Sequence, residues 1–197
     1  MRIRVALDLS LVVLIALAEG SSALAETIDP DNDGSQYAWA ENVGWLNAEP
    51  LGDGGSGIRV LDTRLDGWMW SENTGWISLS CANTASCART SYGVTNSSGF
   101  LAGYAWSENT GWISFSCENT SSCGTADYGV TISQTTGEFS GYAWGENVGW
   151  VSFSCENTST CGSVDFRMKT DVPFLPSELF ADGFESGDTS AWLASVP

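Results

Sequence analysis

The stretch Tyr104-Ala-Trp-Ser-Glu-Asn-Thr-Gly-Trp112 decides the fold, because the chain contains four versions of it at intervals of 31 to 38 residues. Aromatic and β-branched residues flank an Asn-x-Gly turn, in which Asn suits the turn and Gly supplies a positive φ. Such a pattern is typical of a β-hairpin. The other copies occupy residues 37–45, 68–76 and 142–150. The sequence therefore predicts four hairpins.

The pairing register within each hairpin can be argued from the distribution of apolar side chains. In the third copy, pairing Trp106 with Ile113 and Tyr104 with Phe115 places all four side chains on one face. We expect this apolar face to lie against the core. The second Trp of each copy would then lie on the opposite face, among small and polar residues.

A third extended segment precedes all hairpins but the first, at residues 57–61, 92–95 and 128–132. Residues 165–170 match these segments, yet no hairpin follows them. They could therefore pair beside the first hairpin and close a ring, which would remove exposed sheet edges. The predicted fold class is all-β, with about four three-stranded antiparallel units. A closed, barrel-like ring and an open solenoid or sandwich both remain possible.

The N-terminal 25 residues are typical of a secretory signal peptide, with a basic start, a short apolar run and an Ala-Leu-Ala site. We expect residues 26–36 to form an acidic leader, 37–170 the Trp-rich repeat domain, and 171–197 a linker and acidic tail. No segment is apolar enough to span a bilayer. The expected product is a monomer that is secreted, displayed at the cell surface or held in the periplasm.

The composition excludes several classes of site. The chain has no His and a formal net charge of −17. Without His there is no Ser-His-Asp triad and no His-ligated metal, and such acidity argues against nucleic-acid binding. The six Cys form three pairs of equal spacing, which in an exported chain predicts three local disulfides. The expected pairs are Cys81 with Cys87, Cys117 with Cys123, and Cys155 with Cys161.

The second Trp of each copy is the candidate binding residue. An indole on a polar face can stack on a sugar ring or anchor an extracellular protein. Alternatively, these side chains pack against the next repeat as a ladder that solvent never reaches. Burial distinguishes the two interpretations. The residues concerned are Trp45, Trp76, Trp112 and Trp150.

The leader contains a D-x-D-x-D-G string formed by Asp29, Asp31 and Asp33. Short carboxylates before a Gly turn can converge on Ca²⁺, as in an EF-hand loop. The twelfth position of such a loop should be Glu, but Ala40 stands there. The string predicts either a calcium site or a solvated acidic leader, and no other cofactor is expected.

Catalysis would need a distinct acidic pair, as in glycoside hydrolases. The candidates are the turn residues Glu41, Glu72, Glu108 and Glu146. Because all four occupy equivalent turn positions, a shared structural role explains them better than an active site. We therefore expect no enzymatic activity.

The repeat resembles a tandem repeat of bacterial secreted and cell-surface proteins, with the signature G-Y-A-W-[SG]-E-N-x-G-W-[IV]-x-F. Residues 141–153 match it fully and residues 128–140 match its usual lead-in. The first copy departs after Trp45, which predicts an irregular unit there, and residues 180–192 look like a short C-terminal element of exported bacterial proteins. The resemblance implies export and a β-repeat architecture. The leading hypothesis is a non-catalytic structural or adhesive module that contacts a glycan or an extracellular protein, and the alternative is a carbohydrate-binding module.

Overall fold

The computed structural model describes residues 27–50 and 57–174, and the structural account concerns these ranges. The predicted signal peptide and most of the predicted C-terminal tail lie outside them.

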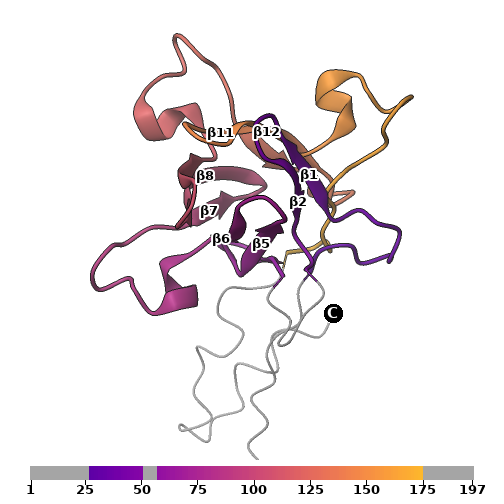
Figure 1. Cartoon of the computed structure of the whole chain (residues 1–197). Coiled ribbons are helices and arrows are strands. Elements are labelled where there is room, and N and C mark those ends of the chain that lie inside the picture. The colour runs from indigo at the N-terminus through magenta and orange to yellow at the C-terminus, as the bar shows by residue number, and fades with distance from the viewer. Residues whose placement is uncertain (1–26, 51–56, 175–197) are drawn as a thin grey trace, which may run out of the picture.

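Eight of the twelve strands in the described ranges form a closed antiparallel barrel around a common centre (Figure 1). Neighbouring hairpins join through the pairs β2–β5, β6–β8, β9–β11 and β12–β1. The last pair closes the ring, so of the two arrangements that the sequence left open the closed one is present, and the open solenoid is wrong. The four hairpins are β1 (Tyr37–Ala40) with β2 (Gly44–Asn47), β5 (Trp68–Ser71) with β6 (Gly75–Ser78), β8 (Phe100–Ser107) with β9 (Gly111–Ser114), and β11 (Phe139–Gly145) with β12 (Gly149–Ser152).

The remaining strands form a second sheet that continues from the barrel. In it, β4 pairs with β3 and β7, and β8 pairs with β7 and β10. The long strands β8 and β11 belong to both sheets and change from one to the other at Gly103 and Gly141, each with positive φ. The additional strands are β3 (Arg59–Val60), β4 (Arg64–Asp66), β7 (Val94–Ser97) and β10 (Val130–Ile132).

The segment after the last disulfide loop completes the first unit, as predicted. Met168 bridges to Gln36, and the Tyr37 amide donates to the Arg167 carbonyl at 3.2 Å. The start of the leader also belongs to the domain, because Ile28 is buried and bridges to Thr170. The first hairpin has the same register as the others, so the expected irregularity is confined to the chain that follows it.

The predicted hairpin register is wrong by one residue. Trp106 lies opposite Trp112, and Ala105 lies opposite Ile113. The turn has three residues between the paired positions Ser107 and Gly111, rather than the four that we expected. This register turns Ala105, Ser107 and Ile113 inward. An eight-stranded barrel is just wide enough for side chains of this size, so the indoles lie outside.

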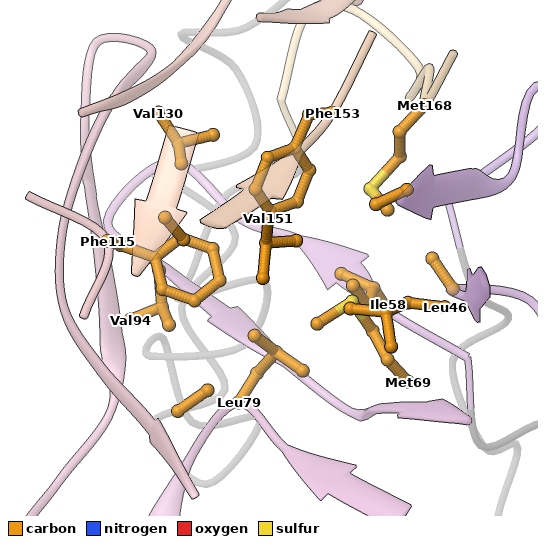
Figure 2. Packing of buried hydrophobic residues seen from close by; sticks show 14 of the residues in the cluster. Leu46, Ile58, Met69, Leu79, Val94, Phe115, Val130, Val151, Phe153 and Met168 are labelled. Atoms are coloured by element: carbon orange, nitrogen blue, oxygen red, sulfur yellow. The ribbon is translucent and has the colours of Figure 1, made fainter. Parts of the chain in front are cut away.

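The core fills the barrel and the space beneath the second sheet (Figure 2). Inside the barrel it consists largely of Ala, Ser, Val, Leu and Ile. Larger rings lie where the sheets diverge, with Phe115 and Phe153 5.7 Å apart between centroids and Phe153 stacked on Phe139. Residues from all four units meet there, including the ten labelled in Figure 2: Leu46, Ile58, Met69, Leu79, Val94, Phe115, Val130, Val151, Phe153 and Met168.

Three disulfide-closed loops project from the barrel (Figure 1). Each contains a short 3₁₀ helix: η1 (Cys81–Thr84), η2 (Cys117–Thr120) or η3 (Cys155–Thr158). The predicted local pairs Cys81–Cys87, Cys117–Cys123 and Cys155–Cys161 are confirmed. Three disulfides suggest an oxidising, extracellular-type environment. Within the described ranges, no helix has the length and apolar character needed to cross a bilayer.

Candidate functional site: an aromatic cleft on the barrel wall

The outer face of every hairpin carries aromatic side chains from both strands. The observed register places the two Trp of a copy directly opposite each other, where cross-strand ring contacts stabilise the pair. Centroid distances are 4.8 Å for Trp39–Trp45, 4.9 Å for Trp70–Trp76 and 4.5 Å for Trp106–Trp112. The first Trp of each pair was not predicted to lie on the surface, because the predicted register turned it toward the core.

The predicted Trp row reaches solvent. Trp45, Trp76 and Trp112 are 42%, 45% and 42% exposed, while Trp150 is half-buried. A ladder that is hidden from solvent is therefore wrong. The leading segment of the same unit does contribute one aromatic contact to three of the four residues. These are Tyr92 on Trp112, Tyr128 on Trp150 and Phe166 on Trp45, each with centroids 5.3 Å apart.

Among the described residues, Trp76 has no equivalent aromatic neighbour from a leading segment. Tyr92 and Tyr128 each stand directly before a Gly, at positions 93 and 129, and the matching Gly57 follows Ser56 instead. Position 56 lies outside the described residues, but serine cannot supply a ring. Trp76, at 45%, is the most exposed Trp in the described part of the chain.

A cleft of about 810 Å³ lies between hairpins β5–β6 and β8–β9, and we call it the β6–β8 cleft. Its size is in the range of small-ligand pockets. It contains five indoles, a tyrosine ring and a polar rim that comes largely from the loop closed by Cys81 and Cys87 and from the residues that follow this loop. The lining residues are Trp68, Trp70, Gly75, Trp76, Ser78, Thr84, Ser86, Arg89, Thr90, Tyr92, Trp106, Glu108, Asn109 and Trp112. Of this set, sequence reasoning named Trp76 and Trp112 as binding residues.

Arg89 is the basic residue of this cleft, and its guanidinium has no ion-pair partner in the described structure. The other described basic residues are all paired with carboxylates. Hydrogen bonding to Asp165 raises the pKa of Arg167, and hydrogen bonding to Asp31 raises the pKa of Lys169. The guanidinium of Arg89 is therefore free to donate to a bound molecule. The paired residues are Arg59 and Arg64 with Asp66, Arg167 with Asp165 and Glu138, and Lys169 with Asp31.

The repeated Asn of the turn links one hairpin to the next. Asn73 Nδ2 donates to the Val43 carbonyl at 2.9 Å, and Asn109 Nδ2 donates to the Thr74 carbonyl at 2.8 Å. The same contact recurs from Asn147 to the Thr110 carbonyl (3.0 Å). At the seam that closes the ring, Asn42 donates one residue earlier in the motif, to the Asn147 carbonyl (3.2 Å). These bonds run around one end of the barrel and hold the four turns together.

Two of the repeated Glu side chains also have structural contacts. Glu41 accepts a hydrogen bond from the Trp150 amide at 3.2 Å, across the seam that closes the ring. Glu72 accepts one from the indole nitrogen of Trp70 at 3.4 Å. These contacts favour the expected structural role for the turn carboxylates.

The aspartates of the leader organise their own loop. Asp29 is buried and accepts hydrogen bonds from Asp33 N, Gly34 N and Ser35 Oγ at 2.9, 3.0 and 3.1 Å. Asp31 forms an ion pair with Lys169. Hydrogen bonding from Ser35 holds the pKa of Asp33 below its ordinary value.

The predicted calcium ligands do not form a tight group. In the described ranges, sets of three possible ligand atoms within 4.8 Å of one another occur at Cys117–Cys123–Asp127 and Cys155–Cys161–Asp165. The sulfur atoms of both sets are already bonded in disulfides. A calcium site at Asp29, Asp31 and Asp33 stays a prediction.

Comparison of the chain with protein-family models, curated proteins and solved structures finds no match in any of the three. The resemblance to bacterial surface repeats therefore stays a prediction.

Proposed function

We propose that the protein is an exported, non-catalytic module that binds saccharide chains in the β6–β8 cleft. The observation that carries the proposal is the set of five indoles that line this cleft. The C–H faces of a sugar ring stack well on an indole, which offers a large and rigid apolar surface. Binding of this kind would give the module an adhesive or structural role outside the cytoplasm.

The rim of the cleft favours a saccharide over an apolar protein surface. The rim carries the hydroxyls of Thr84, Ser86 and Thr90, together with the polar side chains of Arg89 and Asn109. A sugar hydroxyl can donate to or accept from each of these groups. The Thr84 and Ser86 hydroxyls already hydrogen-bond within the disulfide loop, and Asn109 donates to Thr74, whereas the Arg89 guanidinium has no ion-pair partner in the described structure. An apolar partner would cover that guanidinium without offering an acceptor, which costs free energy.

The acidic residues of the cleft support a binding role without hydrolysis. Among the described residues that line it, Glu108 is the one carboxylate. Most glycoside hydrolases use two carboxyl groups on either side of the scissile bond. Glu41 and Glu146 belong to the other two hairpins, and Glu41 accepts a structural hydrogen bond there. Glu72 lies in the β5–β6 turn, where it accepts a hydrogen bond from the Trp70 indole and is not among the residues that line the cleft.

Titration with uncharged hexasaccharides tests the proposal. The probes are cellohexaose, chitohexaose, xylohexaose and mannohexaose, and the readout is intrinsic Trp fluorescence. We expect at least one probe to bind the wild type and Trp76→Ala to weaken that binding about tenfold or more. Trp144→Ala is the matched control, because Trp144 is 38% exposed but does not line the cleft.

Two results would contradict the proposal. A wild-type protein with native circular dichroism that binds none of the four probes would remove the saccharide function. Equal losses in Trp76→Ala and Trp144→Ala would place binding outside the β6–β8 cleft.

A further inference from the structure

We propose that the barrel carries a second saccharide-binding cleft on its opposite side, so that one domain holds two glycan chains and cross-links them. This inference rests on the proposed function of the β6–β8 cleft. It adds a second site, and it predicts that one domain cross-links two glycan chains, which a single site could not do.

The second cleft lies at the seam where β12 meets β1 and the ring closes, and we call it the β12–β1 cleft. It has a volume of about 480 Å³. Aromatic side chains line it together with two carboxylates and two hydroxyl side chains. The residues that matter here are Trp39, Tyr142, Trp150, Tyr128, Glu41 and Asp127.

The two clefts are equivalent in the repeat. Each lies between the second strand of one hairpin and the first strand of the next. Trp150 and Trp39 occupy the same motif positions at the β12–β1 seam that Trp76 and Trp106 occupy at the β6–β8 seam. A sugar ring that stacks on Trp76 and Trp106 therefore finds indoles in matching positions in the second cleft, although the counterparts of Trp70 and Trp112 do not line it.

The topology places the clefts on opposite sides of the barrel. Going around the ring in one direction, four strands (β8, β9, β11 and β12) separate the two seams, and in the other direction β1, β2, β5 and β6 separate them. In Figure 1, β8 and β6 lie at the left and lower left of the barrel, and β12 and β1 lie at its top and right. A chain bound in one cleft therefore faces away from a chain bound in the other.

Two further differences between the clefts set which saccharide chains the second cleft prefers. Tyr142 stands where the first cleft has Trp68, and Tyr128 packs against Trp150, so its volume is smaller. Glu41 and Asp127 give it negative charge, and no basic residue is among those that line it. We expect it to bind the same uncharged chains less tightly and to disfavour acidic ones.

Calorimetric titration with the four hexasaccharides measures the stoichiometry. For a probe that binds, we expect two molecules per wild-type chain and one per chain in each of the variants Trp76→Ala and Trp39→Ala. One molecule per wild-type chain would overturn the second cleft and leave the proposed function intact. No binding by the wild type would overturn the proposed function itself.

Two further measurements keep the inference testable if Trp39→Ala does not fold. In the wild type, the indole N–H resonances of Trp39 and Trp150 should shift with ligand, as those of Trp76 and Trp106 do. The wild type, shown to be monomeric by light scattering, should precipitate the long polymer of the same sugar, whereas Trp76→Ala should not. Unchanged Trp39 and Trp150 resonances, or no precipitation by the wild type, would overturn the inference.

Discussion

The side-chain amide of Asn119 makes two hydrogen bonds to the backbone of Gly103. Its Oδ1 accepts from the Gly103 amide at 2.9 Å, and its Nδ2 donates to the Gly103 carbonyl at 2.7 Å. The contact ties the disulfide loop to the point at which β8 changes from one sheet to the other. The same pair of bonds recurs between Asn83 and Gly67 and between Asn157 and Gly141.

Replacing this amide by a carboxylate should destabilise the fold. In Asn119→Asp the donor to Gly103 and Ser114 is lost, and a negative charge faces the Gly103 carbonyl. We expect the free energy of unfolding in urea to fall by about 2 kcal/mol or more. Asn109→Asp is the control, because its amide donates to the Thr74 carbonyl in an exposed turn. A loss in the control as large as that in Asn119→Asp would contradict the structural role of the Asn119 contact.

Gly103 itself should not tolerate a side chain. A Cβ there would lie 2.1 Å from the Gly93 carbonyl oxygen, at a φ of +84°. We expect Gly103→Ala to cost more than about 3 kcal/mol or to prevent folding. Gly111 has a similar φ of +80° but nothing within 4 Å of a Cβ. Gly111→Ala should therefore cost only the strain of the left-handed conformation, about 1 kcal/mol. Thermal unfolding of both variants measures the difference, and similar melting temperatures would refute the proposed steric clash.

A buried hydroxyl offers a stabilising substitution. Thr110 is buried, its Oγ1 has no hydrogen-bond partner, and the equivalent residue in the fourth hairpin is Val148. Thr110→Val keeps the shape and removes the unpaired group, so unfolding should cost about 1 kcal/mol more. The reciprocal variant Val148→Thr should lose stability. Chemical denaturation of both variants checks that their free energies of unfolding change in opposite directions. A lower free energy of unfolding in Thr110→Val would show that the Thr110 hydroxyl has a hydrogen-bond partner in solution.

A substitution in residues 165–170, the segment that closes the ring, should also stabilise the fold. Tyr128 donates a hydrogen bond from its hydroxyl to Ser114 Oγ at 3.0 Å, and Tyr92 does the same to Ser78. Phe166 occupies the matching position against Trp45 but has no hydroxyl. By the same geometry, Phe166→Tyr should reach Ser152 and add about 1 kcal/mol to the free energy of unfolding. Tyr128→Phe should lose a similar amount. A destabilised Phe166→Tyr would mean that the closing unit departs from the repeat geometry.

Several elements could be predicted from residue pattern alone. Local turn chemistry places each hairpin at its Asn-x-Gly stretch, and equal spacing pairs the cysteines, because both depend on residues close in sequence. The match between residues 165–170 and the leading strands predicted the contact with the first hairpin, now seen as the Gln36–Met168 bridge. This long-range contact could be predicted because the first hairpin has no leading strand and residues 165–170 have no hairpin after them.

The register could not be predicted in the same way. Hydrophobicity ranks the face with Tyr104 and Trp106 as more apolar, yet Ala105 and Ser107 face the core. Space inside a closed eight-stranded barrel decides this choice, because small side chains fill it and indoles do not. The consequence for the candidate site is direct, since the first Trp of each pair lies on the surface only in the observed register.

The sequence by itself therefore determined the all-β class, the four hairpins, the local disulfides and the segment that closes the ring. These features follow from contacts between near neighbours or from the repeat. Only the tertiary structure decided the inward face and the two aromatic clefts. A cleft forms where two hairpins meet, with Trp76 and Trp106 contributed by units that lie 30 residues apart in the chain. Ring closure then places the second cleft, with Trp39 and Trp150, on the opposite wall, because it joins residues from the two ends of the domain.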